Sequence, residues 1–336
     1  MPGMNRSARF AKLALRWLGS GLALVLILLF MISCYLISGQ NEPFRLADAG
    51  LLPEKQIVAP KVPADLQDEA AATKNAPAET YKTQPAGVVF VSTMQYLAQR
   101  ELDTASGWTP NDILPPMSLL DNKQNFQLGV INVVQRSAFV LMENLSRSRT
   151  IDKINENAKT AFNLYSNEPT RWWQIPSYEG KVKNANRELA HYIEELRSGK
   201  ASFYARADNL TQLNEKYASL LGSITTALTE DNLSFFETDD RYYNAKGMAY
   251  AMYAFYQAVQ HDFGDVAAKN DASPLLQSII DQLETAYFEP LVVMNGDQDS
   301  IFANHLRNLA STLFNVRQKI NSLNSVLRHQ GSSSAG

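Results

Sequence analysis

The sequence predicts an all-α fold in which a single transmembrane helix precedes an extracytoplasmic bundle with long, heptad-like helices. Three observations predict it: residues 18–38 carry no charge, apolar residues recur at helical spacing from about residue 87 to residue 329, and no two segments look like a strand pair. The expected divisions are a basic head (1–17), the span (18–38), a Pro/Ala-rich tether (39–86), the helical domain (87–329) and a disordered tail (330–336).

The predicted span follows a head with four basic and no acidic residues. As a helix, its 21 residues would be about 30 Å long, the thickness of the hydrocarbon core of a bilayer. The positive-inside rule then leaves the N-terminus in the cytoplasm and sends the rest across the membrane. The residues expected to define this anchor, with the lipid bilayer as partner, are Arg16, Trp17, Leu22, Ile32 and Tyr35.

Two other interpretations of this segment remain open. A cleaved signal peptide has a shorter apolar core and a small-residue cleavage site, whereas the apolar stretch here continues through Tyr35, Leu36 and Ile37. Cys34 could instead be lipidated, although the residues around it fit that signal poorly. An uncleaved anchor is the interpretation we favour.

Residues 39–86 contain six prolines and no sustained apolar period. Frequent prolines interrupt helices and cannot donate to a central sheet, so we expect a flexible or semi-rigid spacer. A short ordered turn is predicted near its start, where Phe44, Leu46, Leu51 and Leu52 are clustered.

The helical domain should contain eight to ten helices. Residues 126–145 are apolar nearly all round, as in a helix at the centre of a bundle. Residues 203–228 and 302–327 carry apolar seams with a mean spacing of 3.5 residues, which favours packing at a shallow angle, with Asn214 fixing the register. We expect these seams to pack within the domain; the alternative is a coiled coil with a second chain. Ser273 is expected to cap one helix, and Asp299 or Ser300 the last.

Composition and motifs restrict the function. The net charge of -3 argues against nucleic-acid binding, and the single cysteine excludes a disulfide framework and a Cys-based zinc site. No cofactor or metal is expected, because no phosphate-binding, dinucleotide or hydrolase motif occurs. Glu237, Asp239 and Asp240 are weak candidates for an acidic site, since acids at a helix N-terminus are common without catalysis.

Two loops rich in tryptophan are the best candidates for a contact surface. Trp and Arg are frequent at binding hot spots, although a loop Trp can also fold back into the core. The candidate residues are Trp108, Asp112, Arg171, Trp172 and Trp173.

The first of these loops, with three other segments, carries a resemblance to a known family. The chain resembles, over nearly its whole length, a family of uncharacterised proteobacterial inner-membrane proteins known as a domain of unknown function. That resemblance implies one N-terminal span, a helical extracytoplasmic region and a bacterial envelope location, but no activity. The segments are Gly107-Trp108-Thr109-Pro110-Asn111-Asp112, Asn125-Phe126-Gln127-Leu128-Gly129, Asp239-Asp240-Arg241-Tyr242-Tyr243 and Lys246-Gly247.

We therefore expect a single-pass protein of the bacterial inner membrane whose periplasmic domain is a non-enzymatic scaffold or adaptor. It would bind an envelope protein or a second copy of itself. One alternative is a hydrolase acting on cell-wall glycan or lipid, with two carboxylates converging near Trp108 or Trp172. The other is a ligand-binding domain, although about 17 cytoplasmic residues are too few for an output domain.

Overall fold

The computed structural model describes residues 44–52, 57–58, 80–81, 84–113, 121–147, 153–230, 233–288, 290, 293–296 and 303–333, with eight positions between 17 and 31. Residues 84–333 form a helical body, so the all-α prediction is confirmed. Its described part contains nine α-helices and one π-helical segment. The helices are α3 (Val88–Leu102), α4 (Asp121–Val140) continued by the π-helix η3 (Leu141–Leu145), α5 (Glu156–Tyr165), α6 (Tyr178–Arg197), α7 (Ala207–Leu228), α8 (Phe235–Asp262), α9 (Gly264–Lys269), α10 (Ser273–Glu284) and α11 (His305–Ser333).

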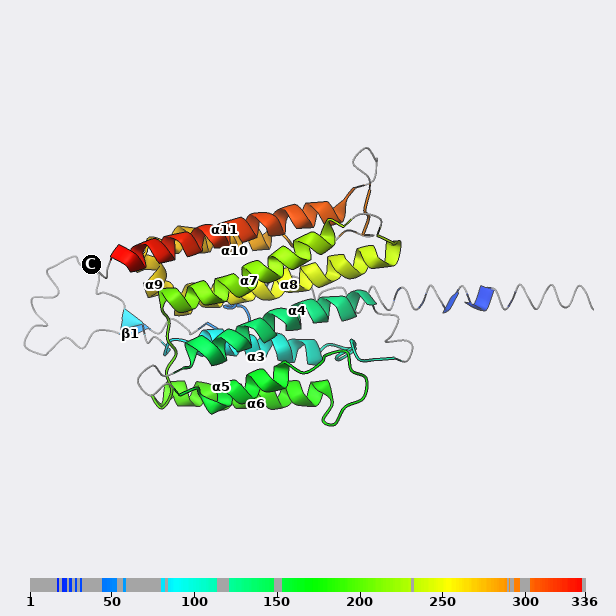
Figure 1. Cartoon of the computed structure of the whole chain (residues 1–336). Coiled ribbons are helices and arrows are strands. Elements are labelled where there is room, and N and C mark those ends of the chain that lie inside the picture. Colours follow the sequence, from blue (N-terminus) through cyan, green and yellow to red (C-terminus); the bar gives the residue numbers. More distant parts are fainter. Residues whose placement is uncertain are drawn as a thin grey trace, which may run out of the picture.

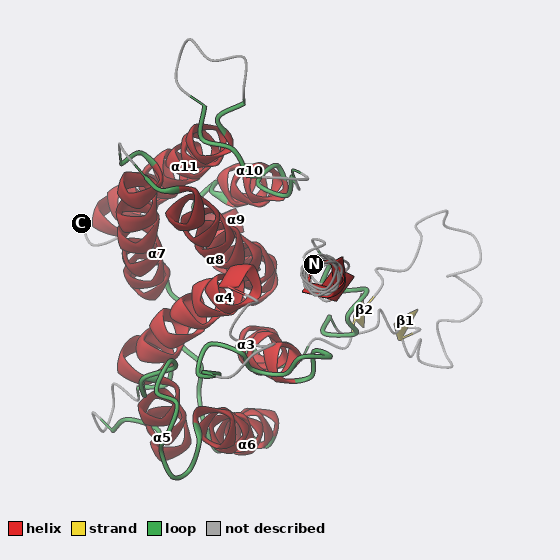
Figure 2. Cartoon of the chain, turned by 90° about the vertical axis from the view of Figure 1, so that its right-hand side faces the viewer, coloured by secondary structure: helices red, strands yellow, loops and turns green. Residues whose placement is uncertain are grey.

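Helix α4 lies at the centre of the body, with α3, α5 and α6 on one side and α7, α8, α10 and α11 on the other (Figures 1 and 2). Its apolar residues are buried nearly all round, as the sequence predicts. Helices α4 and α8 run parallel, because paired residues advance together along both: Asn125 contacts Asp240, and Gly129 contacts Asn244.

The contact between α4 and α8 is close enough to require glycine. A Cβ atom on Gly129 would lie 2.1 Å from the carbonyl oxygen of Asn244, and one on Gly247 would lie 2.1 Å from that of Phe126. Alanines 245, 249, 251 and 254 along α8 are also buried. Small residues therefore let these two long helices pack almost backbone to backbone.

The two heptad-like seams pack against each other inside the chain. Helices α7 and α11 are antiparallel, with the amide of Asn214 donating to Asn324 at 2.8 Å and accepting from the hydroxyl of Tyr256 at 2.9 Å. Leu221 and Leu313 on the two seams are fully buried. The intramolecular prediction is confirmed, and a coiled coil with a second chain is wrong for these seams.

Several boundaries differ from the prediction. Ala272 takes the N-cap position of α10, with Ser273 as the first helical residue and Pro274 next. Helix α11 begins at His305, where the side chain of Asn304 accepts from the N–H of Arg307 at 2.8 Å. Asp299 and Ser300, the caps expected for this helix, lie outside the described residues. The helix continues to Ser333, into the predicted disordered tail.

The predicted spacer also contains order. Strand β1 (Ile57–Val58) pairs antiparallel with β2 (Thr80–Tyr81), a short ladder that its proline-rich composition does not predict. Upstream, residues 44–52 form turns, and Leu46 is fully buried against the helical body. The predicted ordered turn is therefore confirmed, and this part of the spacer is docked on the body.

Candidate functional site

The four segments that carry the family resemblance meet at one end of the body, which we call the Trp end. It comprises residues 103–113, residues 166–177 and the first turns of α4, α6 and α8. Three contacts join these parts: Asn125 donates to Asp240 at 2.6 Å, Trp108 Nε1 donates to the carbonyl of Pro169 at 3.1 Å, and Asn111 donates to Glu179 at 3.4 Å.

Gln127 fixes the loop between α3 and α4. Its side-chain oxygen accepts from the backbone N–H of Thr109 at 3.0 Å and from the Thr109 hydroxyl at 2.9 Å. Its amide nitrogen donates to the carbonyls of Glu101 and Gly107, both at 2.9 Å. Because Gln127 is fully buried, these bonds are shielded from competing water, and they hold the loop that contains Trp108.

Trp108 is part of the core and does not belong to an exposed contact surface. Only 4% of it is exposed, and its ring lies 5.0 Å from the ring of Tyr178 at the start of α6. The bond from its indole nitrogen to Pro169 satisfies the single polar group of the side chain, which is what burial of a Trp requires.

The second loop presents its aromatic residues to the outside. Trp172 is 62% exposed, Trp173 is 68% exposed and the nearby Ile175 is 98% exposed. Arg171 is exposed beside them, whereas Asp112 on the neighbouring loop is half-buried, and burial together with Glu179 raises its pKa. The predicted contact surface therefore divides, with Arg171, Trp172 and Trp173 available and Trp108 enclosed.

Glu101 and Lys123 are two buried ionisable residues beneath the first loop, close enough for each to affect the pKa of the other. Burial raises the pKa of Glu101 to about 7, against the lowering effects of Arg100, Lys123 and Gln127. Burial also lowers the pKa of Lys123 to about 8, against the effect of Glu101. The Lys123 ammonium donates to the hydroxyls of Thr104, at 2.5 Å, and Ser106. The pair can exchange protons near neutral pH, but it is enclosed by the loop.

The acidic candidates lie where α4 and α8 begin. Burial, together with Asp121 and Asp240, raises the pKa of Asp239 to about 6. Burial, Asp121 and Glu237 also raise the pKa of Asp240. Asp239 could exchange protons at mildly acidic pH, but the positive ends of two helix dipoles explain the presence of both carboxyls without catalysis.

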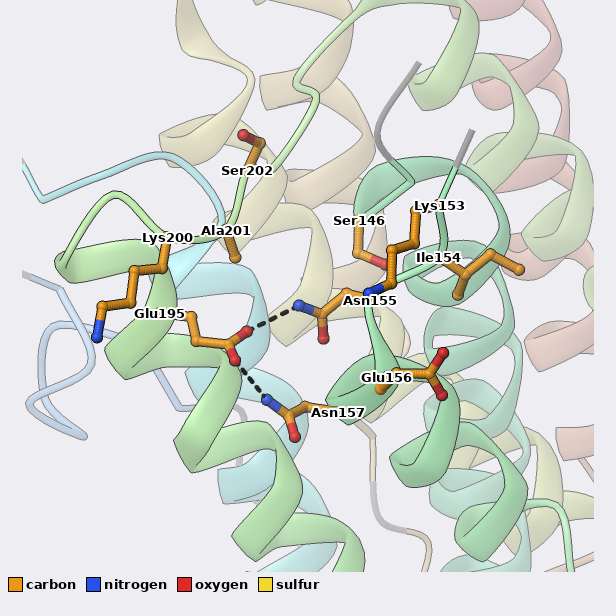
Figure 3. Close-up of a pocket in the computed structure, with 10 residues that line it drawn as sticks. All are labelled: Ser146, Lys153, Ile154, Asn155, Glu156, Asn157, Glu195, Lys200, Ala201 and Ser202. Atoms are coloured by element: carbon orange, nitrogen blue, oxygen red, sulfur yellow. Dashed lines mark hydrogen bonds between the residues drawn. The ribbon is translucent and has the colours of Figure 1, made fainter. Parts of the chain in front are cut away.

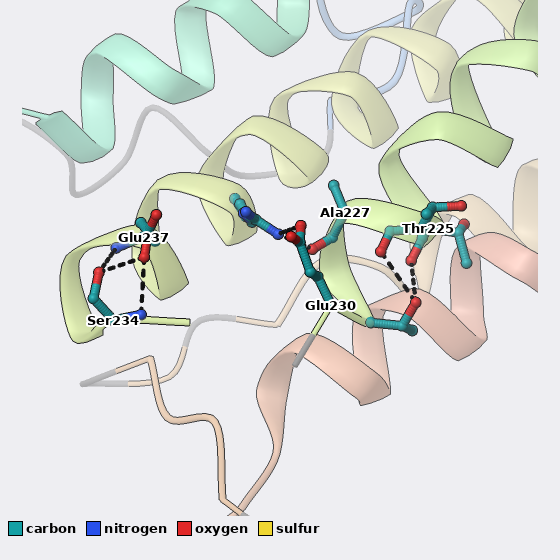
Figure 4. A network of polar contacts seen from close by, with 8 residues as sticks. Thr225, Ala227, Glu230, Ser234 and Glu237 are labelled. Atoms are coloured by element: carbon teal, nitrogen blue, oxygen red, sulfur yellow. Dashed lines mark hydrogen bonds and ion pairs between the residues drawn. The ribbon is translucent and has the colours of Figure 1, made fainter. Parts of the chain in front are cut away.

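Glu237 has a structural role. Its carboxylate accepts from the N–H of Ser234 at 2.9 Å while its own N–H donates to the Ser234 hydroxyl at 3.3 Å, a capping box that begins α8 (Figure 4). The Ser234 hydroxyl holds the pKa of Glu237 below its usual value. Beside it, Arg241 joins the start of α8 to the end of α7 by donating to Glu230 at 2.5 Å and to the carbonyl of Ala227 at 2.7 Å.

A polar pocket of about 440 Å³ lies at the opposite end of the body, where α5 begins and α6 ends (Figure 3). The carboxylate of Glu195 accepts from the side-chain amides of Asn155, at 2.7 Å, and Asn157, at 2.9 Å. Lys153 and Lys200 also line it. The pocket could take a small polar molecule, but none of the residues predicted as site candidates lines it.

The predicted anchor falls largely outside the described residues. Trp17 and Leu22 are helical and exposed, whereas Arg16, Ile32 and Tyr35 are among the residues that the structure does not describe. Over the positions that are described, no helix has both the length and the apolar character needed to cross a membrane.

The family model described as "Uncharacterized protein conserved in bacteria (DUF2333)" matches residues 57–234 and 227–331. The chain belongs to this family. The predicted resemblance to an uncharacterised bacterial family is thus confirmed. Searches of curated proteins and of solved structures give no match. The DUF2333 match includes the Trp end, the pocket and both seams, and it begins after the docked segment 44–52.

In this DUF2333 chain, sequence reasoning missed Gln127, Lys123 and Glu101. The sequence signal for Gln127 is weak: a buried amide needs hydrogen-bond partners, but the same stretch contains Asn132, Gln135 and Arg136, and nothing in the pattern marks Gln127 as the buried one. Glu101 and Lys123 gave none, since charged residues near helix ends are ordinarily solvated. The pocket gave none either, because most of its residues are ordinary polar residues of loops and helix ends.

Proposed function

We propose that this chain is a membrane-anchored scaffold of the bacterial envelope. Residues 18–38 cross the inner membrane, the basic head stays in the cytoplasm, and the helical body binds other envelope components on the periplasmic side. The charge pattern supports the anchor, as do the exposed apolar side chains at helical positions 22, 24, 25, 28 and 31.

The observation that carries the proposal is the docking of residues 44–52 on the body. The ring of Phe44 lies 5.1 Å from that of Tyr96 on α3 and 5.4 Å from that of Tyr250 on α8. The N–H of Leu46 donates to the side chain of Gln257 at 3.1 Å. The docked segment thus begins at Phe44, shortly after the end of the proposed span.

This docking would hold the body near the membrane. Only five residues separate Ser38 from Phe44, and the six Cα-to-Cα steps between them (44 − 38) reach at most about 20 Å when extended. The proline-rich stretch after Leu52 connects two segments that both belong to the packed structure, residues 44–52 and the part that begins at residue 84, so it does not lengthen the tether. A body held at a fixed height suits a scaffold that aligns partners along the membrane.

The hydrolase alternative lacks this kind of support. It requires two carboxylates converging in a concave site with Trp108 or Trp172. Trp108 is buried, Glu237 is engaged in capping, and the pocket of Figure 3 contains none of these residues.

Membrane fractionation tests the anchor. We expect the full-length chain to remain in membranes washed with alkaline carbonate, and protease to reach the body only from the periplasmic side. The variant L24K/L28K should be released by the wash, whereas F314K, at an exposed position on α11, should behave like the wild type. Release of the wild-type chain, or cleavage only from the cytoplasmic side, would contradict the proposal.

Intact-complex mass spectrometry after gentle detergent extraction tests the scaffold function. We expect a stoichiometric envelope protein or a defined homo-oligomer. A monomer without any partner would contradict it. A charged residue in place of Leu313 or Leu221 would not test for an oligomer. Both side chains are buried between α7 and α11, so the body itself would unfold.

A further inference from the structure

The exposed large apolar side chains of the body gather at one end. Among the described residues of the body, these side chains are Ile113, Trp172, Trp173, Ile175, Met294 and Phe314. All except Phe314 lie at or beside the Trp end. Met294 lies there because its N–H donates to His305 at the start of α11, whose ring is 6.2 Å from that of Phe288, and Phe288 accepts from Tyr242 near the start of α8.

The loop that carries the two exposed tryptophans is held in place without their help. The Lys181 ammonium donates to Asn167 at 2.6 Å and to Gln174 at 2.7 Å, which joins both sides of the loop to α6. Pro169 accepts the bond from Trp108. The rings of Trp172 and Trp173, 6.5 Å apart, are therefore presented outward by an ordered backbone.

The Trp end also faces the described positions of the N-terminal helix. The described residues between 17 and 31 are helical, and Figure 1 places them beyond the first turns of α4 and α8. Figure 2, which looks onto this end, shows that short helix end-on. The proposed span and the exposed apolar side chains therefore lie on the same side of the body.

We propose that the Trp end rests on the bilayer, with Trp172, Trp173 and Ile175 in the headgroup region of the leaflet that the span leaves. Trp is favoured at this depth because its ring is apolar and its indole N–H still reaches water or headgroup oxygens. Arg171, exposed beside them, is placed to meet lipid phosphates. This inference rests on the proposed anchor, and its occupant is lipid, not a protein.

Quenching of Trp fluorescence by brominated lipid tests this, because the four tryptophans report on different places. Full-length wild type, W17F, W172F/W173F and W17F/W172F/W173F would be reconstituted in vesicles of phosphatidylcholine and phosphatidylglycerol, with and without bromine on the phosphatidylcholine acyl chains. Every variant retains the buried Trp108, so none disturbs the core. The triple variant, with Trp108 alone, is the control and should show no quenching.

We expect W17F to lose emission in brominated vesicles because Trp172 and Trp173 contact lipid. W172F/W173F should also lose emission, through Trp17, which reports the anchor. Quenching of W172F/W173F without quenching of W17F would overturn the inference and leave the anchor intact. Quenching of W17F alone would support lipid contact by the loop and overturn the anchor, and quenching of neither would overturn both. Protection of W17F from aqueous iodide without bromine quenching would indicate a protein on the loop and would also overturn the inference.

Discussion

Replacing either glycine at the α4–α8 contact by alanine should destabilise the body. A Cβ atom at Gly129 or at Gly247 would lie 2.1 Å from a main-chain carbonyl oxygen of the other helix, whereas Cβ contacts under 3.0 Å essentially never occur. Because the opposing atoms are backbone, no side chain can move aside. The two helices must separate by about 1 Å, and the core around them must repack.

The expected loss is about 2 kcal/mol for each single variant. Overpacking a core costs about 1–3 kcal/mol, and a clash with backbone belongs at the upper end of that range. Alanine returns about 1 kcal/mol through its higher helix propensity. The double variant should lose only about 3 kcal/mol, since the separation forced by one Cβ makes room for the other.

Urea unfolding of the full-length chain in detergent, followed by circular dichroism, measures these losses. Gly222→Ala in α7 is the matched control, because its Cβ would meet only the guanidinium of Arg317, at 3.1 Å, and that group can move. It should be neutral or stabilising by up to about 1 kcal/mol. Wild-type stability in G129A and G247A, or fully additive losses in the double variant, would refute the reasoning.

Two further predictions concern the Trp end. The raised pKa of Glu101 means that the folded chain holds this proton more tightly than the unfolded chain does. The protonated carboxyl therefore stabilises the fold by about 3 kcal/mol at low pH, and this stabilisation is lost as the pH rises from about 4.5 to 7. Replacing Glu101 by Gln should remove this pH-dependent decrease in the free energy of unfolding. Urea unfolding across this range checks it, and a variant with the wild-type slope would contradict it. Replacing Gln127 by Leu should leave the polar groups of Thr109 and two carbonyls unpaired and cost about 3–5 kcal/mol. The emission of Trp108, in a chain that lacks the other three tryptophans, should shift to the red, whereas Gln95→Leu should leave it unchanged.

The architecture followed from the sequence where periodicity decides it. The seams of α7 and α11 have the spacing of helices that pack at a shallow angle, and Asn214 pairs with Asn324 and Tyr256 at their contact. The central position of α4 follows from its apolar pattern as well. The apolar spacing that predicts these helices involves residues close together in the chain, so a single sequence is enough to recognise it.

The exposed surface at the Trp end could not be predicted from the sequence, because the burial of a loop depends on residues that are distant from it in the chain. The loops around Trp108 and Trp172 have similar compositions, each with Trp, Pro and an amide. Gln127, on the next helix, encloses the first loop, and Trp108 then provides the bond that positions Pro169 in the second. What separates a core Trp from a presented one is therefore which partner reaches it across the fold.

The proposed span and the proposed lipid contact of the Trp end would together fix the orientation of the body on the membrane. A single span fixes the height of a body but leaves it able to rotate about the anchor. Lipid contact by residues 172–175, displaced from the docked segment 44–52 and joined to it through α3, α4 and α6, would leave one orientation. The pocket around Glu195, at the opposite end of the body, would then face away from the membrane. Partners of such a scaffold would meet that end or the sides of the bundle, so cross-links to them should come from residues near Lys153 and Lys200, not from the Trp end.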